Sequence, residues 1–246
     1  MTKRQGFKGA HVLVVVLTLL WLPAANAQET GWQTIVEGGT DFPIAVGARA
    51  VVITPVNVRL SLGAGVFPGP YLDAINGAVV PFTADTGYDA NDARVVKDAL
   101  KNSAVIRLHG GFQFTENFYG EVGYGWVGLG GSVKGQDVII LVTDYQGETQ
   151  PGGYGNQTRE YSIDSTLHMV NAEFGWEWTD LDPWVFRTAL GVAWTVAAET
   201  AVDAEFEPKA PGFNDALETY AEDYLDDLYT TVVISPTFSF GVGYRF

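Results

Sequence analysis

An aspartate, a serine and a histidine lie close together in the sequence and could form a hydrolytic site. Asp164, Ser165 and His168 are the residue types of an orienting carboxylate, a nucleophile and a general base. The surrounding segment alternates with a period of two, so Ser165 and His168 point to opposite faces of an extended strand. A hydrogen bond between them would need a bulge. The pattern therefore predicts no catalytic residues in this chain.

Charged side chains recur on the glycine-rich faces of several strand-like segments. Long charged groups in a narrow, enclosed space are tolerated only when they are paired and hydrogen-bonded. We therefore expect a network of ion pairs inside the molecule. Its predicted members are Arg49, Arg59, Arg107, His109, Glu121, Glu173, Glu177, Arg187 and Arg245. The excess of arginine over glutamate in this set leaves a narrow, mildly anion-selective conduit as an alternative.

Acidic residues form a third chemical feature near the C-terminus. Residues 214–229 repeat apolar residues at helical spacing, with carboxylates on the remaining faces. We expect a helix with a solvated acidic face. Calcium binding by Glu222, Asp223, Asp226 and Asp227, bridging lipopolysaccharide phosphates, is an alternative, although the spacing of an EF-hand loop is absent. A second helix is predicted over 91–103.

Composition excludes several classes of protein. The chain of 246 residues contains no cysteine, which excludes disulfide scaffolds and thiolate metal sites. Its net charge is -15, with 14 Lys+Arg against 29 Asp+Glu, so a nucleic-acid partner is not expected. Neither a cofactor nor a metal centre is predicted.

The N-terminus has the pattern of an export signal. Lys3, Arg4 and Lys8 precede an apolar run over 12–22, and residues 25–27 form a small-x-small cleavage pattern. The run is shorter than the roughly 20 residues that a spanning helix needs. We expect 1–27 to be a cleaved signal peptide and 28–246 to be one exported domain.

Seven segments alternate with a period of two and are long enough to be membrane strands. Aromatic and aliphatic residues share one face of each segment, whereas the other face carries glycine and charge. A secreted soluble β-barrel or sandwich would show the same period but would not expose so many tryptophans. The segments span residues 42–53, 58–67, 104–114, 118–128, 161–178, 184–197 and 237–246.

The last segment resembles the closing strand of a bacterial outer-membrane β-barrel. It ends on Phe246, with Tyr244 and Phe240 on the same face. The resemblance to the small, eight-stranded members of this family implies that these aromatics are the signal read by the barrel-assembly machinery. It also implies export to the outer membrane of a Gram-negative bacterium.

Loop lengths predict the topology. Residues 54–57, 115–117 and 179–183 are short turns, whereas 68–103, 132–158 and 201–230 are long connections. Outer-membrane barrels have short periplasmic turns and long external loops. An even strand count then requires an additional first strand. Gly31 to Glu37 is the segment left for it; the alternative is that 28–41 is a plug or a tail. We expect an all-β fold, a transmembrane antiparallel up-and-down barrel of eight strands with short helices in its external loops.

The predicted turns also set the strand register. The turn at 179–183 places Arg187 opposite Gly175 and diagonal to both Glu173 and Glu177. Glu121 falls near Gly111 and diagonal to His109.

The sequence thus predicts a monomeric integral outer-membrane protein whose lumen is filled by side chains. Its role would be structural or would involve surface interactions through the acidic external loops, with membrane lipids and lipopolysaccharide as partners. A small-solute channel and a lipid-modifying enzyme that uses His168 remain alternatives.

Overall fold

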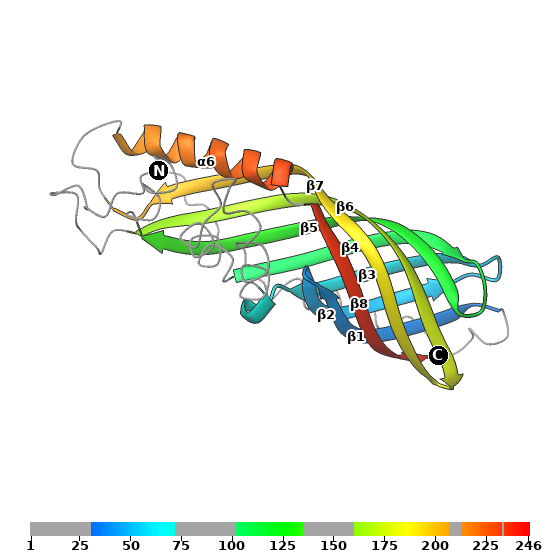
Figure 1. Ribbon diagram of the computed structural model, residues 1–246. Coiled ribbons are helices and arrows are strands. Elements are labelled where there is room, and N and C mark those ends of the chain that lie inside the picture. Colours follow the sequence, from blue (N-terminus) through cyan, green and yellow to red (C-terminus); the bar gives the residue numbers. More distant parts are fainter. Residues whose placement is uncertain (1–30, 72–101, 135–159, 207–212, 233) are drawn as a thin grey trace.

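The computed structural model describes residues 31–71, 102–134, 160–206, 213–232 and 234–246 (Figure 1). The predicted signal peptide and most of the predicted helix over 91–103 lie outside these residues. Asn102 and Ser103, which were assigned to that helix, instead begin strand β4. No helix in the described part of the chain is long and apolar enough to cross a membrane.

Eight strands form a closed barrel in which each strand pairs antiparallel with the next and β8 pairs with β1 (Figure 1). The predicted up-and-down topology is therefore confirmed. The strands are β1 (Gln33–Phe42), β2 (Ala45–Ile53), β3 (Val58–Val66), β4 (Asn102–Gln113), β5 (Phe118–Lys134), β6 (Glu160–Leu181), β7 (Trp184–Ala204) and β8 (Ile234–Arg245).

Two ends of the barrel can be distinguished by their connections. Short connections join β2 to β3, β4 to β5 and β6 to β7 at the end where the chain terminates, which we call the turn end. Asn57 adopts a positive φ of 64° in the first of these connections, a conformation that asparagine tolerates better than most residues. The opposite end, with the long connections, is called the loop end.

The first strand differs from its predicted limits. β1 continues to Phe42 and is joined to β2 by a tight connection at Pro43 and Ile44, so β2 begins at Ala45 rather than at residue 42. The prediction that strand 1 ends near Glu37 is wrong, and so is the alternative of a plug or tail over 28–41. The added residues bring Asp41 onto the inward face of the barrel.

Strands β5, β6 and β7 are also longer than predicted and continue past the other strands at the loop end (Figure 1). We call residues 128–134, 160–167 and 198–204 the sheet extension. A β-bulge shifts the β6–β7 register at His168 and Met169, because Val196 has no partner opposite it. Beyond the bulge, the even-numbered residues of β7 point inward instead of the odd-numbered ones.

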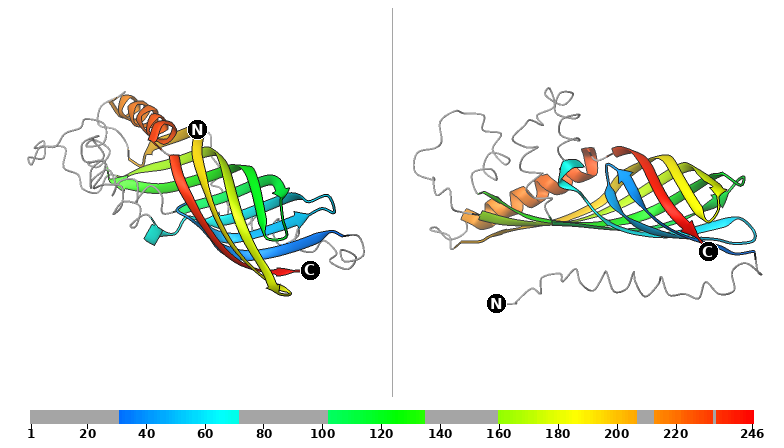
Figure 2. Two further views of the ribbon diagram at one scale, coloured as in Figure 1. Left: turned by 45° about the vertical axis from the view of Figure 1, so that its right-hand side comes forward. Right: turned by 90° about the horizontal axis from the view of Figure 1, so that it is seen from below.

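Helix α6 (Phe213–Val232) covers the inner face of the sheet extension, and the predicted helix over 214–229 is confirmed (Figure 2). Ala221, Leu225 and Tyr229 recur at a spacing of four and are at most 5% exposed. They join one apolar cluster with inward residues of the three long strands. Burial raises the pKa of the Tyr229 phenol, which therefore stays neutral in these surroundings.

Two carboxylates of α6 bind the backbone of β7. Strand β8 begins at Ile234, opposite Trp194, so it leaves the last part of β7 unpaired on that side. Glu222 accepts a hydrogen bond from the Val202 amide (2.9 Å), and Glu218 accepts one from the Ala204 amide (3.0 Å). Glu218 and Glu222 are four residues apart on the helix, a rise of about 6 Å, which is close to the rise between Val202 and Ala204 on the strand. These two glutamates thus satisfy a strand edge and do not form only a solvated face.

Candidate functional site in the barrel lumen

Inward side chains of seven strands meet in a layer of charge that crosses the lumen. Four arginines come from β2, β3, β4 and β7, and five carboxylates come from β1, β5 and β6. None of the nine side chains is more than 11% exposed. We call this set the ionic layer: Glu37, Asp41, Arg49, Arg59, Arg107, Glu121, Glu173, Glu177 and Arg187.

Arg49 lies among three carboxylates. Its guanidinium donates to Glu173 Oε1 at 2.9 Å and to Glu121, and its Nε lies 3.6 Å from Glu37 Oε1. Each partner comes from a different strand, and Glu121 and Glu173 lie directly opposite each other on β5 and β6. Adjacent carboxylates repel, so the guanidinium that bridges them offsets that repulsion.

Arg59 is fully buried at the turn-end side of the layer. It donates to both oxygens of Glu177 (2.7 and 2.9 Å), to Glu121 Oε1 (2.9 Å) and to Gln113 Oε1 (2.6 Å). Its guanidinium carbon also lies 4.1 Å from the centre of the Tyr119 ring. The bidentate pair with Glu177 is the strongest kind of charge-assisted contact available to a carboxylate.

Arg187 contacts carboxylates across the bore. Its Nε lies 2.8 Å from Glu37 Oε1, and its other nitrogens lie 3.3 Å from Asp41 and 3.5 Å from Glu173. The predicted register was wrong by two residues: Arg187 is opposite Glu177, and the strand ladder continues to Leu181 and Trp184. Although Arg187 lies opposite Glu177 in the sheet, its ion pairs are with Glu37, Asp41 and Glu173.

Arg107 and His109 occupy the inward face of β4. Arg107 pairs with Asp41, a residue that the sequence analysis did not place in the barrel. His109 is 3% exposed, and its Nδ1 lies 3.4 Å from the Ser61 hydroxyl. The predicted pairing of Gly111 with Glu121 matches the strand register.

Arg245 does not belong to the lumen network, contrary to the sequence-based prediction. Its Nη2 donates to Asp182 at 2.8 Å in the connection between β6 and β7, where the aspartate side chain is 71% exposed. The odd parity of β8 continues to Arg245, but this residue lies at the rim, where a long side chain reaches solvent.

Sequence reasoning did not place three residues of this network in the lumen: Glu37, Asp41 and Tyr119. Glu37 and Asp41 share parity, which was the available signal, but the first strand was predicted to end at Glu37 because its alternation was legible only over Trp32, Thr34 and Val36. The two additional acids change the charge balance. The layer has five carboxylates against four guanidiniums, a formal charge of −1 with His109 neutral, whereas an excess of arginine was expected.

Apolar side chains lie on both sides of the ionic layer. Ile35, Val51, Ile53 and Val185 form a cluster toward the turn end. A larger cluster toward the loop end joins inward residues of the barrel to α6. The layer also borders a small cavity lined by Glu37, Asp41, Arg49, Arg107 and Arg187 with small residues between them. The charges are thus enclosed between apolar layers.

The three residues that suggested hydrolysis are separated by the fold. Ser165 points inward, is 3% exposed and lies 3.0 Å from the Thr200 hydroxyl. His168 is half-buried on the outward face, where its Nδ1 is hydrogen-bonded to the Tyr124 hydroxyl. Asp164 is exposed on the outward face. No group of three or more potential metal ligands occurs among the described residues, so the proposed calcium set finds no support there.

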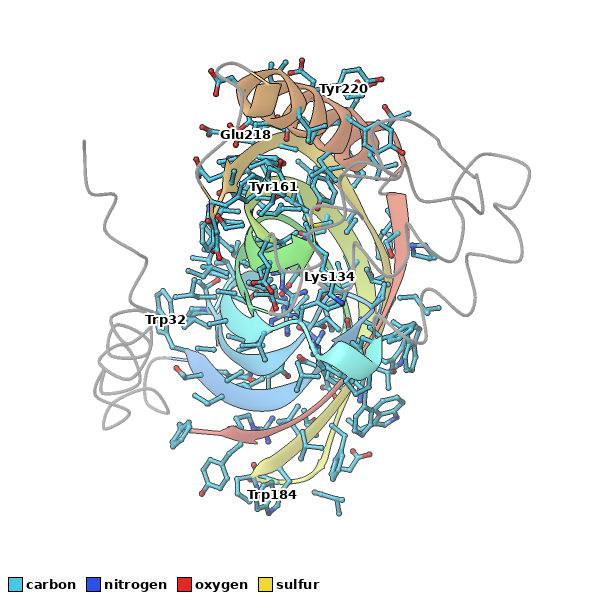
Figure 3. All side chains as sticks on the ribbon, turned by 90° about the vertical axis from the view of Figure 1, so that its left-hand side faces the viewer. Trp32, Lys134, Tyr161, Trp184, Glu218 and Tyr220 are labelled. Atoms are coloured by element: carbon cyan, nitrogen blue, oxygen red, sulfur yellow. The ribbon has the colours of Figure 1, made fainter. Side chains whose placement is uncertain are left out.

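Aromatic side chains gather on the outward face near the turn end. Phe118 lies 4.5 Å from Trp176 between ring centres, and Tyr244 lies 4.9 Å from Phe246. Trp184, 52% exposed, points away from the barrel (Figure 3). The Phe246 amide donates to the Thr34 carbonyl at 2.9 Å, so the last residue is held in the barrel wall. Its role in assembly stays a prediction, as do those of Tyr244 and Phe240.

Comparison with solved structures returned bacterial proteins of low sequence identity. The N-terminal β-barrel domain of Pseudomonas aeruginosa OprF is 10% identical over 87% of this chain and 96% of that chain, with a TM-score of 0.39. A major outer membrane protein from Thermus thermophilus is 14% identical over 87% and 99%, with a TM-score of 0.44. Acinetobacter baumannii CarO is 12% identical over 87% and 97%, with a TM-score of 0.35. No protein-family model and no curated protein matches the chain. The predicted eight-stranded antiparallel barrel is confirmed by the strand order of this chain itself.

Proposed function

We propose that this chain is an integral outer-membrane protein whose closed barrel anchors an external structure made of the sheet extension and α6. The role would be structural or would involve surface interactions, with the turn end in the periplasm and the loop end outside the cell. The observation that supports it is a reversal of polarity along the three long strands.

Below His168, the outward face is apolar and the inward face is charged. Val122, Phe174 and Leu190 are 60–68% exposed, and nothing in the described chain covers them. Glu173 and Arg187, by contrast, are buried inside the barrel. Exposure of so much apolar surface marks a contact with lipid or with another protein. A lipid bilayer explains its extent around the whole barrel.

Above His168, both faces change character. The outward face of the sheet extension carries the exposed acids Asp164, Glu199 and Asp203. Its inward face carries Ile163 and Val202, each 2% exposed, in the cluster with α6. Figure 3 shows Tyr161 beneath α6, from which Tyr220 points away. This arrangement is that of a soluble protein, which supports a membrane boundary near His168.

Single cysteines test this proposal, because the chain contains none of its own. We expect a membrane-impermeant maleimide to label Asp223→Cys on intact cells and to leave Leu190→Cys unlabelled. Both side chains are exposed in the isolated protein, and Leu190 is 68% exposed. In the cell, contact with lipid would protect Leu190→Cys. Equal labelling of both variants would contradict the proposal, and labelling of Leu190→Cys after heating in dodecyl sulfate controls for reactivity.

Conductance separates an anchor from a small-solute channel. The alternative of an anion-selective conduit depended on an arginine excess that the lumen does not have. The ionic layer is also enclosed between two apolar clusters. We expect no discrete current steps when the refolded protein is inserted into a planar lipid bilayer in salt solution. Heat-modifiable electrophoretic mobility of the same sample would verify that the barrel is folded. Discrete steps that persist in several preparations would overturn the closed-lumen proposal.

A further inference from the structure

Helix α6 and strand β7 are joined by a ladder of carboxylates and backbone amides outside the barrel. Glu218 binds the Ala204 amide, and Glu222, one helical turn later, binds the Val202 amide. The helix runs antiparallel to the strand, so each step of four residues along α6 matches a step of two residues back along β7. A third contact is therefore expected one step farther along both elements.

The third pair of the ladder consists of Asp226 and Thr200. The Thr200 amide lies on the same strand edge as that of Val202, because alternate residues of a strand direct their amides to the same side. Aspartate is one methylene shorter than glutamate and reaches less far. Asp226 Oδ1 is buried, but it accepts no hydrogen bond from any described residue. The ladder is thus incomplete at this step.

Three hydroxyl groups lie around the incomplete step. Ser165 Oγ is 3.0 Å from Thr200 Oγ1, and both side chains are buried. Burial raises the pKa of the Tyr229 phenol, and the neighbouring Ser165 hydroxyl and Asp226 carboxylate shift that pKa in opposite directions. Tyr229 is 5% exposed, and its hydroxyl has no hydrogen-bond partner in the described part of the chain. Four oxygen-bearing side chains therefore meet within an otherwise apolar cluster.

No positive side chain balances the buried carboxylate oxygen. Helix α6 contains neither lysine nor arginine. Among the described residues of the sheet extension, Lys134 is the only lysine or arginine, and it lies at the far end opposite Glu160. A negative charge that is removed from water without a partner is costly. A small positive ligand would offset this cost.

We propose that Asp226, Tyr229, Ser165 and Thr200 bind one small monovalent cation of the sodium type. The carboxylate supplies the balancing charge, and the three hydroxyl oxygens supply neutral lone pairs. A divalent ion of the calcium type would need more carboxylates, and no group of three or more metal-binding side chains occurs among the described residues. The bound cation would complete the ladder and link α6 to β6 and β7. The site does not depend on insertion of the barrel into a membrane.

Hydrogen–deuterium exchange of the folded protein in detergent micelles tests the proposal. Sodium chloride replaces choline chloride at constant total salt, and the readout is the exchange rate of backbone amides in 213–232 and 198–204. A cation that binds only the seated helix slows exchange by a factor of one plus its concentration divided by its dissociation constant. We therefore expect exchange about tenfold slower at about ten times that constant. Exchange in 184–193 should be equal in the two salts.

Three variants separate a site from general screening of charge. Asp226→Asn should exchange at the same rate in both salts. Asp227→Asn makes the same change of charge at an exposed neighbour and should keep the sodium effect. Asp226→Glu should reach the Thr200 amide as the two glutamates reach theirs, so we expect slow exchange in both salts.

Two results would overturn the inference. One is equal exchange of the parent in sodium and choline, and the other is a sodium effect that survives in Asp226→Asn. Heat-modifiable mobility of every variant shows that the barrel is folded. Failure of the cation site would leave the membrane proposal intact, because labelling of Leu190→Cys tests that proposal separately.

Discussion

Arg49→Met is expected to lower the free energy of unfolding by about 3–5 kcal/mol, the usual cost of removing one partner from a buried ion pair. Arg49 contacts Glu37, Glu121 and Glu173, each of which has a side chain at most 7% exposed. Methionine retains much of the apolar stem but leaves these carboxylates with less positive charge. Urea titration of the folded protein in phospholipid vesicles, followed by tryptophan fluorescence, measures the change.

Arg245→Met provides the matched control. Arg245 forms one ion pair with Asp182 at the rim, where solvent screens the charges, so we expect a loss below about 1 kcal/mol. The double variant Arg49→Met/Glu173→Gln should recover part of the stability, because one uncompensated charge is removed with its partner. Equal losses in the two single variants would show that the ionic layer is no more important than a surface pair.

Gly175→Ala is expected to cost about 1–3 kcal/mol through overpacking. A methyl group at this position would overlap the ring of Tyr119. The ring cannot move freely, because Tyr119 is fully buried, donates to Glu173 at 3.2 Å and accepts from Arg187 at 3.3 Å. The same urea titration measures the loss.

Gly63→Ala is the corresponding control on another inward face. Its nearest contacts would be the Ala48 carbonyl at 3.7 Å and Arg107 Nη2 at 3.9 Å, which are ordinary packing distances. We expect stability to be unchanged or raised by up to about 1 kcal/mol, since alanine restricts the unfolded chain. If Gly63→Ala were as harmful as Gly175→Ala, the close packing of Tyr119 would not explain the effect.

Period-two patterning predicted the inward position of the four arginines that lie in the ionic layer. It assigned Arg49, Arg59, Arg107 and Arg187 to the inward face, and the structure places all four there. Parity is a local property of an extended backbone, so it can be inferred without knowing the neighbouring strand. The eight-stranded fold followed from that parity and from the alternation of short and long connections.

Partner choice inside the lumen could not be predicted in the same way. Arg59 and Glu177 come from β3 and β6, which are not adjacent strands. Cross-strand reasoning considers only neighbours in the sheet, whereas long side chains in a narrow barrel reach across the bore. The turn between β6 and β7 was also placed incorrectly, which shifted the predicted register of Arg187 by two residues.

The bulge at Val196 explains why residues 198–204, the β7 part of the sheet extension, were not predicted as strand. Period-two alternation in β7 changes phase there: odd-numbered residues point inward before the bulge, whereas Thr200 and Val202 point inward after it. The polarity of the two faces reverses at nearly the same point. When phase and polarity both change within a few residues, the sequence pattern of a continuous strand looks like that of a strand followed by a loop.

The span of the ion pairs along the sequence has a kinetic consequence. Arg49 and Glu173 are separated by 124 residues, and Arg187 and Asp41 by 146. Such contacts form only after β1 and β8 have paired and closed the barrel. A folding transition state that precedes this closure therefore contains none of them. Loss of Arg49 should then accelerate unfolding and leave the folding rate nearly unchanged. The ionic layer would determine the lifetime of the folded barrel in the membrane, and not the speed at which it forms.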